Sequence, residues 1–122
     1  MSPVQRYGVS HPGIIATLMA MEENIAEPLS RRELAGIAGL SLRQLERRFA
    51  SELKCSIGQE YLRLRLDAAM RLLRETTLDR REVSVACGFA DLSHFSRTFR
   101  ARFGVSPLRA RRQALGGGLG ET

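Results

Sequence analysis

Apolar residues recur at helical spacing along most of the chain. Two segments show the spacing most clearly, with Ile14, Leu18, Met21 and Ile25 in the first and Leu62, Leu66, Ala69 and Leu73 in the second. Steps of three and four residues place apolar side chains on one face of an α-helix. No segment alternates apolar and polar residues for long enough to indicate a strand. The pattern therefore predicts an all-α fold of about seven helices.

Residues 30–57 recur, shifted by about fifty positions, at residues 79–107. The first copy contains Ser30, Glu33, Ala38, Gly39, Leu45, Phe49, Leu53 and Ser56, and the second contains Asp79, Glu82, Cys87, Gly88, Phe95, Phe99, Phe103 and Ser106. The offset is 49 up to the glycine and 50 beyond it. One additional residue in the second turn explains that change, since insertions fall in loops.

Each copy reads as a short helix, a turn and a second helix. Ser30 and Asp79 are each followed three residues later by glutamate, which is typical of a helix start. Gly39 and Gly88 follow the short helices, where a left-handed backbone is cheapest without a Cβ. The residues expected to cap the second helices are Ser41 and Asp91. Two helix-turn-helix subdomains are the result.

The remaining segments complete the predicted organisation. Pro28 is expected to help end the first helix, and a connecting helix of about 27 Å runs from about Gly58 to Glu75. Ser106-Pro107 opens a last helix that ends near Leu115. The predicted divisions are a flexible segment 1–10, a first helix-turn-helix subdomain 11–57, a linker helix 58–76, a second subdomain 77–115 and a flexible tail 116–122 that begins with three glycines.

The chain is basic, and its cations are almost all arginine. Lys and Arg total 19 against 13 acidic residues, which gives a net charge of +6 over 122 residues, and Lys54 is the single lysine. The excess is greatest beyond residue 80. Arginine forks match phosphates and guanine edges, so a nucleic-acid partner is indicated. An arginine-rich genome is the alternative explanation.

Neither cysteine indicates chemistry. Cys55 and Cys87 are 32 residues apart, with no CxxC motif and no cluster of histidines nearby, so no metal site or disulfide framework is predicted. Both occupy positions of the repeat that favour a small apolar side chain, which predicts packing in a reduced, cytoplasmic compartment. No apolar run approaches the roughly 20 residues of a membrane span. No cofactor is expected.

A helical wheel sorts the second helix of each copy into an apolar back and a polar front. Leu45, Phe49 and Leu53 form one back, and Phe95, Phe99 and Phe103 form the other. The candidate base-contacting residues are Arg43, Gln44, Glu46, Arg47, Leu92, Ser93, His94, Ser96 and Arg97. A helix in the DNA major groove requires this division. A solvated polar face is the alternative for every one of these residues.

The side-chain chemistry suggests separate roles. Arg43, Arg47 and Arg97 can donate two hydrogen bonds to guanine, and Gln44 can pair with adenine. Glu46 can accept from cytosine or pair with Arg43 within the helix. Leu42 and Leu92 contact thymine methyls or simply pack. The candidate phosphate-contacting residues are Arg48, Arg100, Arg102, Arg109, Arg111 and Arg112.

Two segments match a known pattern, GFADLSHFSRTFRARFGVSP at residues 88–107 and RLRLDAAMRLL at residues 63–73. They resemble the signature and the linker helix of the AraC/XylS family of bacterial transcription regulators, and the resemblance covers residues 12–112. It implies a seven-helix domain that places two recognition helices in successive major grooves of double-stranded DNA, roughly 34 Å apart. No apolar stripe is left over for a partner, so the domain alone is expected to be monomeric. It also implies base contacts by Arg47 and Arg97, and activation of transcription beside RNA polymerase.

The family normally adds a sensing domain, which predicts that the chain is the C-terminal part of a larger regulator. The segments MEENIAEPLS and LRQLERRF are similar to members whose N-terminal half resembles class I glutamine amidotransferases. A stand-alone regulator and an architectural module that binds DNA without reading bases are the alternatives. An alkyl-transfer repair enzyme carries a similar domain, but neither cysteine here has a suitable context, and no enzyme is predicted.

Overall fold

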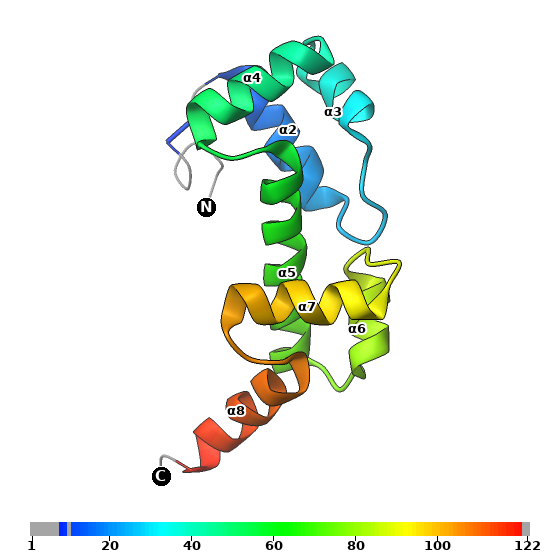
Figure 1. Cartoon of the computed structure of the whole chain (residues 1–122), viewed down its shortest axis with the longest axis vertical. Helices are drawn as coiled ribbons and strands as arrows, with labels where there is room; N and C mark the ends of the chain where they lie inside the picture. Colours follow the sequence, from blue (N-terminus) through cyan, green and yellow to red (C-terminus); the bar gives the residue numbers. More distant parts are fainter. Residues whose placement is uncertain (1–7, 10, 121–122) are drawn as a thin grey trace. The chain divides into compact units, whose positions relative to one another are not determined.

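The computed structural model describes residues 8–9 and 11–120, the side chains of 117–120 excepted, and all regular structure in that part of the chain is helical (Figure 1). The helices are α2 (Pro12–Glu23), α3 (Arg31–Ala38), α4 (Leu42–Leu53), α5 (Ile57–Glu75), α6 (Arg80–Ala86), α7 (Leu92–Phe103) and α8 (Pro107–Gly120). The predicted all-α class is confirmed. Two compact units divide the chain, residues 1–64 and 65–122, and the division falls within α5.

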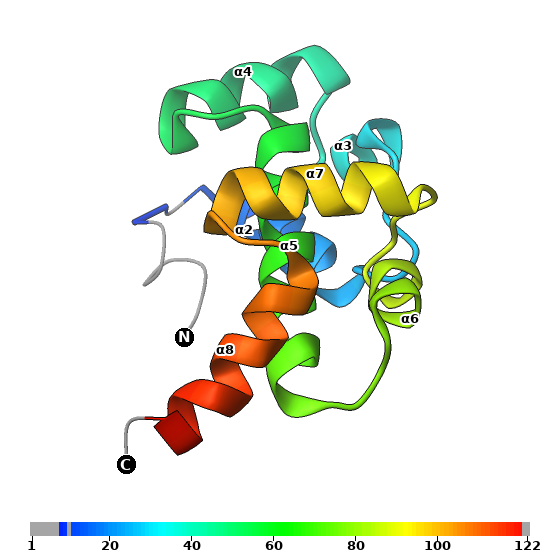
Figure 2. The same ribbon diagram turned by 60° about the horizontal axis from the view of Figure 1, so that its bottom comes forward.

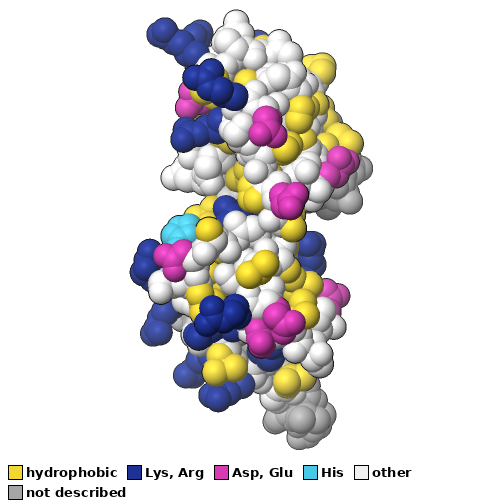
Figure 3. All heavy atoms as spheres, turned by 90° about the vertical axis from the view of Figure 1, so that its right-hand side faces the viewer, with side chains coloured by type: hydrophobic (Ala, Val, Ile, Leu, Met, Phe, Trp, Pro, Cys, Tyr) yellow, Lys and Arg dark blue, Asp and Glu magenta, His cyan; other side chains and the backbone are white. Residues whose placement is uncertain are grey.

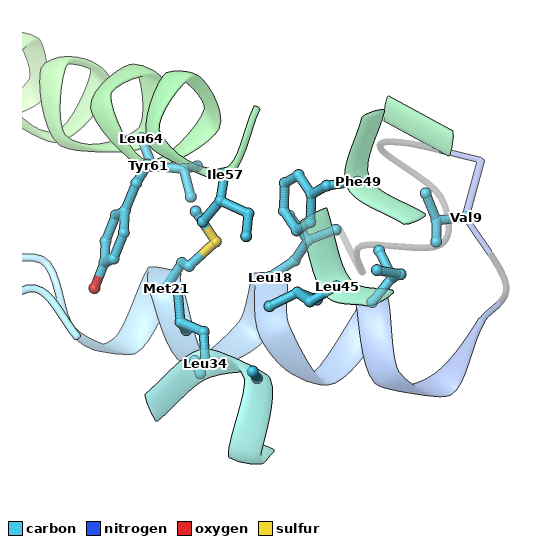
Figure 4. Close-up of a cluster of buried hydrophobic side chains, with 12 residues drawn as sticks. Val9, Leu18, Met21, Leu34, Leu45, Phe49, Ile57, Tyr61 and Leu64 are labelled. Atoms are coloured by element: carbon cyan, nitrogen blue, oxygen red, sulfur yellow. The ribbon is translucent and has the colours of Figure 1, made fainter. Parts of the chain in front are cut away.

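Unit 1 contains α2, α3, α4 and the first turns of α5 around one apolar core. Figure 4 shows this core, in which Leu18 and Met21 of α2 face Leu34 of α3 and Phe49 of α4. The side chains of Leu18, Met21, Leu34, Leu45 and Phe49 are completely buried. Burial of five large apolar side chains, each worth roughly 1.5–3 kcal/mol, holds the three short helices together.

The end of α2 is earlier than the apolar spacing predicts. The helix stops at Glu23, so Ile25 packs on the core from beyond the helix and Pro28 lies too far away to end it. Side-chain hydrogen bonds supply the stop instead. Asn24 Nδ2 donates to Ala20 O (2.8 Å), and Tyr61 Oη donates to Asn24 O (2.5 Å). These bonds satisfy carbonyls that the next helical turn would otherwise use.

Unit 2 contains the rest of α5 with α6, α7 and α8 gathered around it (Figures 1 and 2). Its core is aromatic. Phe95 and Phe99 of α7 are completely buried with ring centroids 5.7 Å apart, and Phe89 packs 5.0 Å from Phe95. Phe103 is half-buried against Phe99. The predicted inward stripe of α7 is therefore confirmed, although its last member lies at the edge of the core.

The predicted helix caps are confirmed. The Ser30 side chain accepts from Glu33 N at the start of α3, and Asp79 and Glu82 exchange reciprocal bonds at the start of α6. The caps of α4 and α7 are Ser41 and Asp91. Both turn glycines have the expected left-handed backbone, with φ of 70° at Gly39 and 80° at Gly88.

The last helix is longer than predicted. α8 begins at Pro107 as expected but continues through the three glycines to Gly120, whereas the sequence predicted its end near Leu115. Glycine lowers helix propensity without blocking the i to i−4 hydrogen bond, so the run of glycines does not by itself end the helix. Most of the flexible N-terminal segment predicted at residues 1–10, and residues 121–122 of the predicted tail, lie outside the described residues.

The repeat identifies a strained residue after α4. Lys54 has a left-handed backbone (φ 60°), and its equivalent fifty residues later is Gly104 (φ 79°). We expect Lys54→Gly to raise the free energy of unfolding by about 0.5–1 kcal/mol, because relief of the left-handed strain exceeds the added entropy of the unfolded chain. Urea denaturation followed by circular dichroism measures the change.

The control introduces a Cβ at the equivalent left-handed position of the second copy. Nothing lies within 4 Å of a Cβ built at Gly104, so Gly104→Ala tests backbone strain without a steric clash. It should lower the free energy of unfolding by a similar amount. A Lys54→Gly variant no more stable than the parent would show that the Lys54 Nζ bond to Ser51 O (2.8 Å) outweighs the strain.

Candidate nucleic-acid interface

Helix α4 has a buried back and a charged front. Leu45 and Phe49 are completely buried in unit 1, and Arg43 and Arg47 are exposed on the opposite side. The two arginines are four residues apart and therefore stand one turn apart on the same face. The structure brings them together as the sequence predicted.

Gln44 is also exposed, but its carbonyl oxygen is already engaged. Gln44 Oε1 accepts from Ser41 N (2.9 Å) and Ser41 Oγ accepts from Gln44 N (3.1 Å), which makes a capping box. A two-bond contact with adenine needs the amide oxygen as well as the amide nitrogen. The predicted adenine contact therefore competes with the cap of α4 and leaves the Gln44 amide nitrogen as the available donor.

The partner of Glu46 differs from the one predicted within the helix. Glu46 Oε2 lies 3.4 Å from Arg31 Nη1 on α3, and the two side chains are 48% and 65% exposed. The partner of Glu46 expected from the sequence was Arg43, within the same helix. An ion pair this exposed contributes at most about 1 kcal/mol, so water or another ligand can displace it readily.

Beside the front of α4 lies an open groove of about 350 Å³. Its lining residues are Leu40, Gln44, Arg47, Arg48 and Ser51. The groove lies between the turn and the exposed face of α4 and carries two guanidinium groups. Its chemistry suits an anionic or hydrogen-bonding ligand.

Helix α7 repeats the arrangement of α4 with different chemistry. Phe95 and Phe99 are buried, while Ser93, His94 and Arg97 are exposed. The flanking residues Leu92 and Ser96 are half-buried. The His94 ring lies 5.8 Å from that of Phe89 in the preceding turn. The exposed front of α7 is thus less charged than that of α4, with Arg97 as the equivalent of Arg47.

The arginines predicted to contact phosphate separate into two groups. Arg48, Arg100, Arg109 and Arg112 are exposed. Arg102 instead pairs with Asp67 (Nη2 to Oδ1, 2.8 Å), and Arg111 donates from Nε to Leu73 O (3.0 Å) and from Nη2 to Thr76 O (3.1 Å). Arg111 thus caps the end of α5, and a structural role accounts for its position without a phosphate.

Arg65 was not among the functional residues predicted from the sequence. This residue on α5 donates to two backbone carbonyls in the turn between α6 and α7. The signal available in the sequence was an arginine immediately beside the apolar stripe of the linker helix. Periodicity alone does not show which backbone group such a side chain reaches.

The cysteines are packing residues. Cys87 is completely buried, and this burial raises the pKa of its thiol to about 11 against the opposing charges of Arg65 and Arg71. Burial, and then the charge of Glu60, also raise the pKa of the half-buried Cys55 thiol, while Arg63 opposes them. Among the described residues, no three His, Cys, Asp or Glu side chains are grouped to hold a metal ion. In the same part of the chain no helix is long and apolar enough to cross a membrane.

Positive charge is visible on both units. Figure 3 shows Lys and Arg side chains gathered at the edge of each unit, with Asp and Glu side chains mostly elsewhere on the face drawn. Two capped helices, each preceded by a short helix and a glycine turn and each carrying an exposed arginine-bearing front, define a tandem helix-turn-helix domain.

Comparison with known proteins agrees with this class. A family model described as a helix-turn-helix domain matches residues 34–113. The HTH-type transcriptional regulator ArgR of Pseudomonas aeruginosa is 41% identical over 117 residues, which are 96% of this chain and 36% of that protein. The HTH-type transcriptional activator RhaS of Enterobacter is 42% identical over 99 residues, 77% of this chain and 34% of that protein. The chain thus spans about a third of the length of these relatives.

Two solved structures extend the comparison. An AraC-type transcriptional regulator from Chromobacterium violaceum superposes with a TM-score of 0.81 at 40% identity, covering 84% of this chain and 92% of that one. The DNA-binding domain of AdpA, solved with a target DNA, gives 0.76 at 30% identity, covering 86% and 96%. The chain belongs to the AraC family of helix-turn-helix transcription regulators.

The raised pKa of Cys87 predicts slow thiol chemistry. In a Cys55→Ser variant at pH 8, the reaction of Cys87 with a disulfide reagent should be at least about a hundredfold slower than that of a free cysteine. Because the thiolate is the reactive form and the pKa is about 11, the rate should keep rising about tenfold per pH unit from pH 7 to 9. A rate that levels off near pH 8.5 would contradict the assignment.

Proposed function

We propose that this chain is a sequence-specific binding domain for double-stranded DNA, which inserts α4 and α7 into successive major grooves. The observation that carries the proposal is the equivalence of the two helices. Each buries an apolar pair, Leu45 with Phe49 or Phe95 with Phe99, and exposes an arginine at the same position of its front. A helix that only covered a core would not need an arginine at both equivalent positions. The AdpA domain, which is similar in fold and sequence, was solved with its target DNA.

The proposed base contacts follow from the exposed groups of each front. On α4 these are Arg43, Arg47, the amide nitrogen of Gln44, and Glu46 once it leaves Arg31. On α7 they are Ser93, His94 and Arg97, with Ser96 and Leu92 at the margins. Two arginines on α4 favour a guanine-containing element, since arginine pairs bidentately with guanine. The mixed front of α7 favours a different element.

Phosphate contacts are proposed for the exposed arginines beside these fronts. Arg48 lies in the groove next to α4, and Arg100, Arg109 and Arg112 are exposed in unit 2. Such contacts supply affinity that depends on salt and not on sequence. Arg102 can bind phosphate only in competition with Asp67. Arg111 is given a structural role in unit 2, because it binds the end of α5, and no phosphate contact is proposed for it.

The proposed biological role is activation of transcription in the bacterial cytoplasm, with RNA polymerase as the partner. RhaS, a relative of this chain, is named as a transcriptional activator.

We propose that the chain belongs to a longer regulator with a sensing domain resembling class I glutamine amidotransferases, and that the domain alone is a monomer. We assign it no catalytic role. An architectural role without base readout is the second candidate, favoured by the charge of +6 alone.

Selection of bound fragments from genomic DNA, followed by footprinting of the best fragment, tests the proposal. Two different protected elements one helical turn apart, roughly 34 Å, would support it. Equal retention of all fragments would favour the architectural role and would overturn sequence-specific binding.

Removal of the equivalent arginines should affect one element each. We expect Arg47→Ala and Arg97→Ala to weaken binding to the preferred site by about 1–3 kcal/mol each, because a bidentate guanine contact is worth that amount. Arg47→Ala should relax the preference within the element bound by α4, and Arg97→Ala within the element bound by α7. Competition binding against a library of singly substituted sites measures both effects.

The matched control removes an exposed arginine from α5. Arg71→Ala changes the net charge by the same amount and should leave both sequence preferences intact. If Arg71→Ala relaxed a preference as strongly as Arg97→Ala, the base-contact assignment of Arg97 would be wrong.

Substitutions at two arginines of unit 2 should have different effects, one on DNA binding and the other on the stability of the fold. Arg100→Gln should weaken binding equally for all sequences and reduce the slope of log affinity against log salt by about one, as expected for one phosphate contact. Arg111→Gln should instead lower the free energy of unfolding by about 1–2 kcal/mol, because it leaves the carbonyls of Leu73 and Thr76 without their donor. An unchanged stability with a reduced salt slope for Arg111→Gln would reverse this assignment.

A further inference from the structure

Arg65 on α5 binds the turn before α7 in addition to the backbone hydrogen bonds of that turn. Arg65 Nε donates to Cys87 O (2.9 Å), and Arg65 Nη2 donates to Gly88 O (2.7 Å). The same guanidinium carbon lies 4.1 Å from the centroid of the Phe89 ring. One side chain therefore binds three consecutive residues of the turn. All of these groups belong to unit 2.

The contact continues from the turn to the front of α7. Phe89 is buried, and its ring lies 5.0 Å from that of Phe95 and 5.8 Å from that of His94. Phe95 belongs to the buried back of α7, whereas His94 belongs to its exposed front. Through Phe89, the position of the Arg65 guanidinium is thus coupled to the first turn of the helix.

The geometry is specific to arginine. A guanidinium presents donors in a fixed plane, so it can bind two adjacent carbonyls and stack on a ring simultaneously. A lysine ammonium is a single point charge without that planar fork. Hydrogen bonds from a charged donor are also stronger than neutral ones.

In unit 1 the equivalent turn packs directly against α2. The carbonyl equivalent to that of Cys87, 49 positions earlier, is that of Ala38. A Cβ built at Gly13 would lie 2.7 Å from Ala38 O, so α2 itself packs directly against that carbonyl. The turn of unit 2 is one residue longer, and Arg65 binds its carbonyls from α5.

We propose that Arg65 is a positioning residue for α7: it fixes the turn from Cys87 to Phe89 and thereby the angle at which the front of α7 meets DNA. Arg65 acts through Phe89 and the backbone and contacts no base. The inference rests on the proposed function, since it assigns to Arg65 the readout of one of the two DNA elements. Angular control matters because base readout depends on donor positions that hydrogen bonding restricts to a few tenths of an ångström.

The test compares Arg65→Lys with the parent chain in two measurements. The first is hydrogen exchange of the Gly88 and Phe89 amides, which donate to Val85 O and Ser84 O, with the Leu40 amide of unit 1 as an internal reference. The second is the preference for the DNA element bound by α7 relative to the element bound by α4. We expect Arg65→Lys to accelerate exchange at Gly88 and Phe89 alone and to reduce the α7 preference about tenfold, the equivalent of one charge-assisted hydrogen bond.

A variant with lower stability but an intact turn is the control. Leu73 is buried in α5 two helical turns beyond Arg65, about 12 Å along the helix. Leu73→Ala should lower the melting temperature of unit 2 and leave the ratio of the two DNA preferences unchanged. Should Arg65→Lys unfold unit 2, Phe89→Leu removes the ring beneath the guanidinium while keeping an apolar side chain, and it should reduce the same preference.

The outcomes distinguish this inference from the proposed function. A parent chain with no sequence preference would overturn the proposed function and, with it, the role of Arg65 in readout. A parent with two preferences, both retained by Arg65→Lys and by Phe89→Leu, would overturn the inference and leave the proposed function standing. Equal loss of the α7 preference in Leu73→Ala would also overturn it, since general destabilisation would then explain the effect.

Discussion

Helices α4 and α7 are stable only because their apolar backs are buried against the other helices of their units. Each helix has twelve residues, which is too short for a helix to be stable alone in water. Leu45 with Phe49, and Phe95 with Phe99, are completely buried and supply the tertiary support. Because these pairs hold the helices in place, the opposite faces can consist of arginine, histidine, serine and glutamine, which contribute little to packing.

Small units make that support marginal, and side-chain hydrogen bonds to the backbone reinforce it. A unit of about sixty residues buries only about 60% of the surface of its unfolded chain. Tyr61 and Arg111 occupy equivalent positions fifty residues apart, and each binds the end of the first helix of its unit. Tyr61 also accepts from Leu29 N (3.0 Å), whereas Arg111 also donates to Thr76 O. Two different side chains thus perform the same anchoring.

The fold could be predicted from the sequence because its determinants are local. Caps at Ser41 and Asp79, the glycine at each turn and the spacing of buried residues are all visible within a few positions of the chain. The end of α2 was not predictable in this way, because the hydroxyl that binds Asn24 O belongs to Tyr61, 37 residues away. The engaged amide oxygen of Gln44, by contrast, could have been predicted from neighbouring residues. The pattern Ser41-x-x-Gln44 is a capping box in the sequence itself, and recognising it would have shown that the amide oxygen is engaged.

Charge was the least reliable guide to the candidate interface, and the reason is geometrical. A helical wheel shows that an arginine is directed away from the core of its own helix, but it does not show which tertiary groups lie within the reach of a long side chain. Arg65 and Arg111 both reach backbone carbonyls, and Arg102 reaches Asp67. A carbonyl at the end of a helix carries part of the negative end of the helix dipole, so it attracts a guanidinium as a phosphate does. The arginines that bind DNA must therefore be sought among those the fold has not already engaged, and the net charge of a small domain overstates how many those are.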